Sequence, residues 1–364
     1  MFHLFRPRIK IVSGVLPDDR PPELKAKDYK TEELIKQPIM ALQWQTWEEW
    51  KSKPENLKML NDIAVNHQGG VGSCAAQASS LALAINNYLE DKKFLKLSAK
   101  PIYARRKNKP NAGMYMDDMG TICINYGTIP EVLYPTPNDN EINMSSLDDY
   151  ISAYEAMAKA LRAKNYFWLN PNIDSFANIL SLNKPIVLTV VFGDGEFEKL
   201  VPEILPVVPK YGHAICALPN AYFTYNGKKA ILIQNSWGTG IGYGGRQILT
   251  EDWFRNNRVV CGIWFEDLNN LAVFNSQITK PRYQFTREME VGMRGEDIAM
   301  LQTCLACLSD SQGALFPLWQ GQSPTGYFGG ITRNAVQRFQ TLYGINPVGR
   351  VGPETLAKLN EVFK

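Results

Sequence analysis

The sequence predicts an α+β protein with more than one domain, and three observations support this. The chain has 364 residues, which exceeds the size of one typical hydrophobic core. Apolar runs at residues 213–218 and 230–238, joined by the loop 219–229, are typical of two neighbouring β-strands. After residue 289, apolar residues recur at helical spacing next to glycine-containing turns. We therefore expect a mixed domain followed by a small helical one.

A reactive thiol is predicted at Cys74, which stands at the start of a helix after the glycine-rich stretch 69–73. A helix N-terminus lowers the pKa of such a thiol, because its free N–H groups favour negative charge and the thiolate is the reactive form. Gln68 stands six residues earlier, and its amide can donate an N–H to a developing oxyanion beside the backbone N–H of Cys74. The segment thus holds a nucleophile and an oxyanion site for acyl transfer.

Only three histidines could act as the base: His3, His67 and His213. His3 lies in the N-terminal tail. His67 neighbours Gln68 on an extended stretch, where adjacent side chains point to opposite sides, so we expect His67 to be a surface or packing residue. His213 begins the first predicted strand and Asn235 lies in the second, so antiparallel pairing would bring them side by side. An Asn carbonyl can accept one imidazole N–H and leave the other ring nitrogen for the thiol.

In their order and local sequences, these residues resemble the catalytic set of the papain-like cysteine peptidases. His213 follows Cys74 by 139 residues and Asn235 follows it by 161, against the roughly 130–150 residues typical of that family. The resemblance implies a helical lobe, a β-barrel-like lobe, Cys74 as nucleophile, His213 as general base and acid, and Asn235 as the orienting residue. It also implies that Gln68 binds the oxyanion and that Trp237 shields the Asn–His hydrogen bond. Gly120 and Ser73 would support the substrate.

The sequence departs from the secreted members of that family. Val71 stands where those members carry a cysteine, Ala75 replaces an aromatic residue, and the stretch 117–121 lacks the partner half-cystine. This pattern is similar to the bacterial and viral branch. We therefore expect no family disulfide, and the six cysteines of the chain form no obvious disulfide framework. Cys304 and Cys307 form a C-x-x-C in a helical pattern without a second ligand pair, so we interpret them as core thiols and not as a metal site.

The composition limits the classes of partner. A hydrophobic content of 45% and a charged content of 21% are typical of a folded globular protein. The net charge of +3 is too small to indicate nucleic acid binding, and we interpret the basic run 105–109 as a solvated loop. No apolar stretch reaches the roughly 18 residues of a membrane span. The first 20 residues lack the apolar segment of an export signal. We predict no cofactor and no metal.

A separate helical unit is predicted at residues 289–364, after a linker at 276–288. Its first helix carries an apolar stripe, and two Gly-x-x-Gly turns, each followed by threonine, precede the second and third helices as an internal repeat. The apolar positions are Ile298, Leu301, Leu305, Leu308, Ala335, Val336, Phe339, Leu356 and Leu359. The unit resembles the small three-helix peptidoglycan-binding domain, which implies a cell-wall ligand. We expect its enlarged loop to expose Phe316 and Trp319, which could stack on a glycan or a partner protein.

The remaining chain divides into an N-terminal extension at 1–45 and a papain-like peptidase domain at 46–275. Only 73 residues precede Cys74, so we expect no long inhibitory segment. The N-terminal extension should instead wrap the peptidase domain or contact a partner.

Together these features predict a cysteine endopeptidase that its C-terminal domain localises to the bacterial cell wall, where it acts on a protein or peptide substrate. Proteins and the peptide stems or cross-bridges of peptidoglycan both stay open as substrates. An alternative is a structural or infection-associated component of a phage virion or envelope assembly, which uses the peptidase fold and the helical module mainly for binding. The lack of an export signal suits release by lysis or packaging into a virion.

Overall fold

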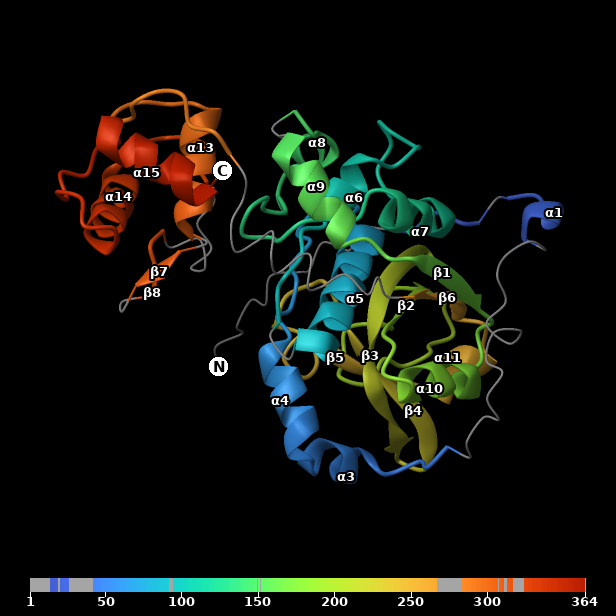
Figure 1. The fold of residues 1–364 in the computed structure, drawn as a ribbon. Helices are drawn as coiled ribbons and strands as arrows, with labels where there is room; N and C mark the ends of the chain where they lie inside the picture. The colour runs from blue at the N-terminus through green and yellow to red at the C-terminus, as the bar shows by residue number, and fades with distance from the viewer. Residues whose placement is uncertain are drawn as a thin grey trace, which may run out of the picture. The chain divides into compact units, whose positions relative to one another are not determined.

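A computed structural model describes residues 14–18, 20–25, 42–91, 94–148, 150, 152–266, 283–306, 308–310, 313–316 and 324–363 (Figure 1). The chain forms two compact units, one made of residues 1–128, 136–150 and 161–268 and the other of residues 129–135, 151–160 and 269–364. Two short stretches that the sequence places inside the peptidase domain therefore group with the C-terminal unit. Within the described residues, no helix has the length and apolar character needed to cross a membrane.

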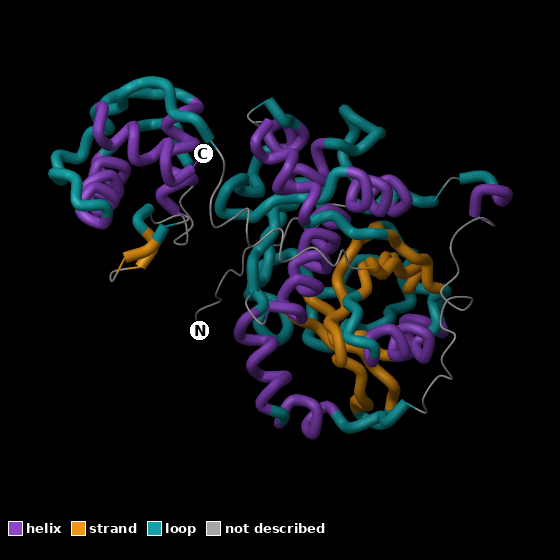
Figure 2. The backbone as a smooth tube through the Cα atoms, viewed as in Figure 1, coloured by secondary structure: helices purple, strands orange, loops and turns teal. Residues whose placement is uncertain are grey.

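The first unit contains helices in its earlier part and strands in its later part (Figure 2). Its helices are α1 (Pro22–Lys25), α3 (Trp47–Ser52), α4 (Pro54–Asp62), α5 (Cys74–Asp91), α6 (Lys100–Ala104), α7 (Met116–Asn125), α8 (Glu141–Ser145), α10 (Ile173–Ser181) and α11 (Glu251–Arg255). Its strands are β1 (Asn165–Leu169), β2 (Ile186–Phe192), β3 (Tyr211–Tyr225), β4 (Lys228–Gln234), β5 (Arg246–Thr250) and β6 (Val259–Glu266). The helix α9 (Ser152–Ala160) belongs to the second unit.

The six strands form one antiparallel sheet in the order β1-β6-β2-β3-β4-β5. Strands β2 and β3 are central, and their apolar side chains are buried, as their runs of β-branched and aliphatic residues require. The register of this central pair sets Val190 opposite His213. The predicted base therefore lies on a strand that is paired on both sides.

The connection between β3 and β4 is a tight hairpin and not the long loop 219–229 expected from the sequence. Asn226 and Gly227 form the turn, with φ angles of 48° and 77°. An Asn-Gly pair suits this turn, because glycine has no Cβ and asparagine tolerates positive φ. The β3–β4 register shifts between Ala217 and Tyr222. This irregularity interrupts the alternation of buried and exposed residues along β3. For that reason the sequence pattern predicted a short strand followed by a loop, where the structure has one continuous strand.

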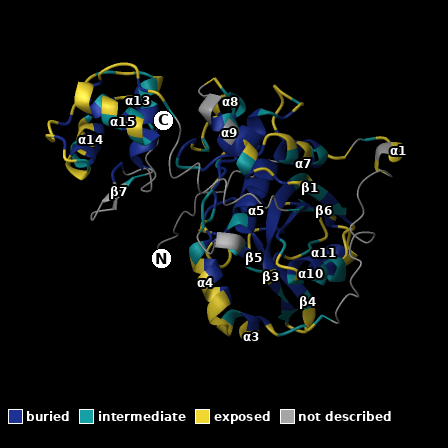
Figure 3. Ribbon diagram, in the orientation of Figure 1, coloured by how far each residue is buried: buried dark blue, intermediate teal, exposed yellow. Residues whose placement is uncertain are grey.

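Helix α5 is buried on nearly all sides, and residues 71–86 are all classed as buried (Figure 3). Its alanines combine high helix propensity with short side chains that allow close packing on β3. They are Ala75, Ala76, Ala78, Ala82 and Ala84. The helix therefore fixes its first residue, Cys74, against the sheet.

The C-terminal unit contains the three helices that the sequence predicts, α13 (Glu296–Ala306), α14 (Gly330–Leu342) and α15 (Pro353–Phe363), with the two-residue strands β7 (Ser309–Asp310) and β8 (Gly313–Ala314). Each of the first two helices, α13 and α14, contains one buried glutamine, and the two glutamines make the same set of contacts. The glutamine amide donates to a threonine in the first turn of the next helix and accepts from a glycine N–H in the turn before it: Gln302 with Thr332 (2.8 Å) and Gly326 (3.2 Å), Gln340 with Thr355 (2.9 Å) and Gly349 (2.8 Å).

The expectation that Phe316 is exposed is wrong. Its side chain is 2% exposed, because the backbone N–H of Leu315 donates to the carbonyl of Leu308 (2.8 Å) and turns this segment back onto the helices. Phe316 is thus a core residue and cannot stack on a glycan. Trp319 and Cys307 lie outside the described residues. Cys304 is fully buried, in agreement with its interpretation as a core residue.

Candidate active site

Cys74 occupies the N-terminus of α5, directly after the turn formed by the glycine-rich loop. Its side chain is fully buried, and the backbone N–H of Ala214 on β3 donates to its Sγ at 3.4 Å. The residue that precedes Ala214 is His213, so the thiol lies beside the backbone of the predicted base. Ser73 is also buried, and its carbonyl accepts the first helical hydrogen bond, from the Gln77 N–H at 2.9 Å.

His213 and Asn235 are joined by a hydrogen bond of 2.9 Å between Nε2 and Oδ1. Asn235 follows the end of β4, and the β3–β4 register makes the two residues diagonal neighbours and not a directly opposed pair. The His213 Nδ1 is buried and makes no hydrogen bond with a described residue. The Trp237 indole stacks on the imidazole, with ring centroids 4.6 Å apart and an interplanar angle of 22°. One ring nitrogen is thus oriented by Asn235, and the other has no hydrogen-bond partner among the described residues.

A residue that sequence reasoning missed holds Asn235 in place. The Asn235 Nδ2 donates to Gln247 Oε1 at 2.9 Å, and the Gln247 Nε2 donates to the carbonyls of Phe197 and Lys199 at 3.0 and 2.8 Å. Gln247 is fully buried on β5, and its amide is saturated. No local motif marks this glutamine. Only the pairing of β5 with β4, which sets Gln247 opposite Ile233, brings it to the site.

Gln68 lies on an extended stretch that pairs with the Asn-Ser-Trp segment. Its backbone N–H donates to the Ser236 carbonyl at 2.7 Å, and its side-chain Oε1 accepts a hydrogen bond from Ser236 Oγ. Its Nε2 donates to the Val71 carbonyl at 3.0 Å, so one N–H of this NH₂ group is engaged and a second is available. The neighbouring His67 is exposed while Gln68 is buried, as alternation along an extended stretch requires.

Gly120 does not lie with these residues. It belongs to α7, and a Cβ on it would stand 2.9 Å from the ring of Tyr166, so its lack of a side chain allows α7 to pack on β1. The glycine that faces the loop before Cys74 is Gly113, whose backbone nitrogen would lie 3.0 Å from a Cβ on Gly72. The resemblance placed Gly120 in a substrate-supporting role, whereas its position on α7 makes it a packing glycine between α7 and β1.

Residues 14–18 run across the site. The Met114 N–H donates to the Gly14 carbonyl (2.8 Å) and the Leu16 N–H donates to the Met114 carbonyl (3.1 Å). On the other side, the Gly14 and Val15 N–H groups both point at the Gly212 carbonyl (3.3 and 3.5 Å). A Cβ on Gly14 would stand 2.6 Å from the Cys74 Sγ. This short segment therefore covers the thiol as an extended chain held from both sides.

Burial sets the charge states of the site. It raises the pKa of the Cys74 thiol to about 11, although the N–H groups of Ala214, Ala75, Cys74 and Gly14 oppose this change. Burial also lowers the pKa of His213 to about 4, and the hydrogen bond that its Nε2–H donates to the Asn235 oxygen offsets only part of this. The expectation of a lowered thiol pKa does not hold in this covered conformation, because loss of solvent outweighs the helix N-terminus. Both groups are neutral here at pH 7.

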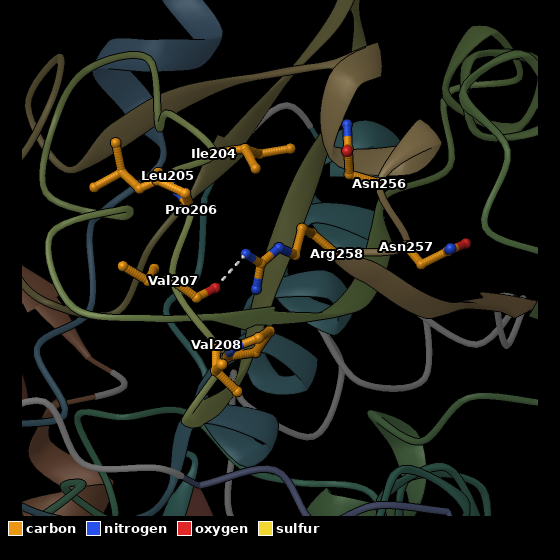
Figure 4. A pocket seen from close by; sticks show the side chains of 9 residues that line it. Ile204, Leu205, Pro206, Val207, Val208, Asn256, Asn257 and Arg258 are labelled. Carbon is orange, nitrogen blue, oxygen red and sulfur yellow. Dashed lines mark hydrogen bonds between the residues drawn. The ribbon is translucent and has the colours of Figure 1, made fainter.

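An open pocket of about 770 Å³ lies beside the loop that leads into β3, and none of the predicted catalytic residues lines it (Figure 4). The buried guanidinium of Arg258 donates to the Glu196 carboxylate and to the Val207 carbonyl, both at 3.0 Å. Glu196 in turn accepts from the N–H groups of Gly193 (2.6 Å) and Leu205 (2.8 Å). This ion pair holds the loop 193–209 in place ahead of His213.

Comparison with known proteins identifies the C-terminal unit. Residues 294–359 match the family model described as "Putative peptidoglycan binding domain". A "Probable N-acetylmuramoyl-L-alanine amidase" from Bacillus licheniformis is 38% identical over 74 residues, which is 20% of this chain and 20% of the relative. An uncharacterized protein from Kitasatospora aureofaciens is 52% identical over 42 residues, or 12% of this chain and 36% of the relative. The chain thus spans at most 36% of the length of either of these relatives.

Solved structures resemble the fold of the remaining chain. Xylellain, a cysteine protease from Xylella fastidiosa, gives a TM-score of 0.56 at 19% identity and covers 73% of this chain and 100% of its own. Digestive procathepsin L2 from the larval midgut of Tenebrio molitor gives 0.51 at 20% identity and covers 68% of this chain and 76% of its own. Likeness at these identities describes the fold. The chain therefore joins a papain-like fold to a C-terminal domain of the peptidoglycan-binding type.

Proposed function

We propose that this chain is a cysteine peptidase that hydrolyses peptide bonds with Cys74 as nucleophile and His213 as base, and that its C-terminal domain retains it on peptidoglycan. The observation that carries the proposal is the 2.9 Å hydrogen bond between His213 Nε2 and Asn235 Oδ1, next to a buried Nδ1 without a partner among the described residues. A structural histidine would use both ring nitrogens in the core. A general base needs one nitrogen oriented and the other free.

The chemistry follows from these positions. His213 Nδ1 takes the proton of the Cys74 thiol, and Sγ attacks the carbonyl carbon of the scissile bond. The same nitrogen then donates that proton to the leaving amine, which leaves a thioester on Cys74. Water, deprotonated by His213, hydrolyses the thioester and releases the acid product. Asn235 and Trp237 keep the imidazole oriented and shield its hydrogen bond from water throughout.

Two N–H donors lie where the oxyanion would form. One is the backbone N–H of Cys74 at the helix N-terminus, and the other is the second N–H of the Gln68 amide. The Gln68 amide donates to the Val71 carbonyl and accepts from the Ser236 hydroxyl, and these two hydrogen bonds fix the amide plane before substrate arrives. Such preorganised donors stabilise the transition state because they need no reorientation during the reaction.

The covered conformation must open for this reaction. Residues 14–18 occupy the path of an extended chain between Met114 and Gly212, and they exclude a substrate carbonyl from the thiol. Once they leave, solvent reaches Cys74 and His213, and the loss of burial allows a thiolate–imidazolium pair to form. The structure is thus a resting form of the proposed peptidase.

Peptidoglycan is the proposed site of action. The match of residues 294–359 to a peptidoglycan-binding model supports retention on the wall. Retention raises the effective concentration of wall-linked peptides around the catalytic unit without a change in its chemistry. We therefore propose peptides linked to the wall, either stem peptides or anchored proteins, as the substrate class.

The test compares single substitutions in the full chain on a fluorogenic peptide mixture and on purified sacculi. Cys74→Ala should abolish hydrolysis, and His213→Ala should lower kcat/KM by at least several hundred-fold, in line with the roughly 10²–10⁴ that general acid–base catalysis contributes. The control is Cys261→Ala, which removes another free thiol and should leave the rate unchanged. Hydrolysis that survives in Cys74→Ala would exclude this function.

A further inference from the structure

Two backbone segments meet beside the nucleophile. Gly72 stands two residues before Cys74, and Gly113 precedes Met114, whose N–H and carbonyl pair with the segment that crosses the site. A Cβ on Gly72 would lie 3.0 Å from the Gly113 nitrogen and 3.3 Å from the Tyr103 hydroxyl oxygen. The loop that carries the thiol and the edge that binds an extended chain are thus in direct contact.

One carboxylate holds both segments. The Gly72 N–H donates to Glu141 Oε2 at 3.1 Å. The Tyr103 hydroxyl donates to Glu141 Oε1 at 2.7 Å and accepts from the Gly113 N–H at 2.9 Å. Glu141 therefore reaches the nucleophile loop directly and the binding edge through one tyrosine. The Asn138 carbonyl adds a contact to the same loop by accepting from Gly70 N–H at 3.1 Å.

A buried arginine fixes the carboxylate. The Arg106 side chain is fully buried, donates to Glu141 Oε1 at 3.1 Å, and lies 3.8 Å from the centroid of the Tyr103 ring. The same guanidinium donates to the carbonyls of Asn111 (2.9 Å) and Tyr103 (3.1 Å). Burial and the Glu141 contact raise the pKa of the Tyr103 hydroxyl, so it stays protonated and keeps donating. Charge-assisted hydrogen bonds of this kind hold their geometry more firmly than neutral ones.

We propose that Glu141 is a positioning residue for the peptidase reaction, which sets the Cys74 loop and the Gly113–Met114 edge in register through Gly72 and Tyr103. This inference rests on the proposed function. The loop contains the Cys74 N–H that faces the oxyanion, while the edge supplies the backbone groups that align an extended substrate. Loss of the Tyr103 contact should affect the edge alone, whereas loss of Glu141 should affect both.

The kinetic consequences differ for the two residues. Tyr103→Phe removes the hydroxyl that accepts from Gly113, so KM should rise several-fold and kcat should stay within about threefold of wild type. Glu141→Gln removes the charge that Gly72 and Arg106 both face, so kcat should fall and KM should rise. The control is Glu48→Gln, because Glu48 lies on α3 with a side chain that is 74% exposed.

Amide hydrogen exchange on the full chain tests the inference without relying on catalysis. Glu141→Gln should speed exchange at both Gly72 and Gly113 by about tenfold or more, since a hydrogen bond to a charged group is lost. Tyr103→Phe should speed exchange at Gly113 and leave Gly72 as in wild type. If Glu141→Gln does not fold, the Tyr103→Phe pattern at the two amides decides the matter.

The inference is overturned if Glu141→Gln leaves both amides at wild-type exchange rates, or if Tyr103→Phe speeds both equally. It is also overturned if kcat and KM of the folded variants equal those of the Glu48→Gln control. A wild-type chain without Cys74-dependent hydrolysis would instead refute the proposed function, and the exchange pattern would still report on the Glu141 contacts.

Discussion

Gly14 lies directly against Cys74, with the position of a Cβ only 2.6 Å from Sγ and 2.6 Å from the Gly72 carbonyl oxygen. No other residue type fits there without a shift of the segment or the loop. A chain that passes so close to a nucleophile keeps other groups away from it, and the Gly14 carbonyl is itself engaged by the Met114 N–H at 2.8 Å.

Gly14→Ala should therefore open the site. A new methyl group in this contact costs about 1–3 kcal/mol, as overpacking does elsewhere, and should raise the rate of Cys74 alkylation by iodoacetamide about tenfold or more. Mass spectrometry of the labelled peptide measures that rate. Gly240→Ala is the matched control, because a Cβ on this exposed glycine meets nothing within 4 Å. Equal alkylation rates in the two variants would show that residues 14–18 do not limit access.

Stability should fall on mild acidification because of His213. Burial lowers its pKa to about 4 from the ordinary 6.5, so the unfolded chain binds a proton near pH 6.5 and the folded chain only near pH 4. Between these values the unfolded state binds more protons, so the free energy of unfolding decreases as the pH falls. The loss due to this group is about 2 kcal/mol between pH 7 and pH 5.

Urea unfolding at pH 7 and pH 5 measures that loss. His213→Asn should reduce the difference between the two pH values by about this amount. A His213→Asn chain with the full wild-type pH dependence would contradict the buried neutral state of the imidazole.

Gln247→Met should lower kcat with little effect on KM. The substitution keeps the volume but removes the oxygen that accepts from Asn235 Nδ2, so Asn235 loses the contact that orients it toward His213. A reduction of about tenfold is expected from one buried hydrogen bond. Gln234→Met is the control, since that buried glutamine donates to the Ala64 carbonyl and not to Asn235. A purely structural role would lower the melting temperature and leave kcat per folded molecule unchanged.

Wall retention should depend on the C-terminal unit. The full chain should sediment with purified sacculi, while a chain ending at residue 275 should remain in solution and still cleave a soluble peptide. Circular dichroism of the truncated chain checks that it folds. If both chains sediment equally, the wall contact lies within residues 1–275. If neither sediments, the helical domain is better explained as a docking element for another protein, as in the virion or envelope alternative.

The order and local sequences around Cys74, His213 and Asn235 predicted which residues would converge, because each lies in a short segment whose chemistry is visible by itself. Gln68 was found in the same way, whereas the role of Trp237 came only from the family resemblance. The supporting contacts were not predictable, since they depend on pairing between distant segments. Gln247 reaches Asn235 only through the β4–β5 register.

Glu141 shows the same limit more clearly. It lies 69 residues from Gly72 in the chain, within a five-residue helix, and nothing in its neighbours distinguishes it from other surface carboxylates. The sequence lacks the half-cystines that secreted papain-like peptidases carry near the corresponding cysteine, and it offers no sign of what holds these loops instead. The contact of Gly14 with Cys74 was equally unpredictable, because a glycine in a short apolar run can serve many structural roles.

The buried amides of Gln302 and Gln340 have a consequence for how the C-terminal unit can vary. Each amide links its own helix to the following turn and to the following helix. These hydrogen bonds lie in the interior and use no surface side chain. An exposed residue such as Ile331 can then be exchanged while these hydrogen bonds persist. Substitutions at exposed positions would therefore change the surface that the domain offers to a ligand and leave its interior hydrogen bonds intact.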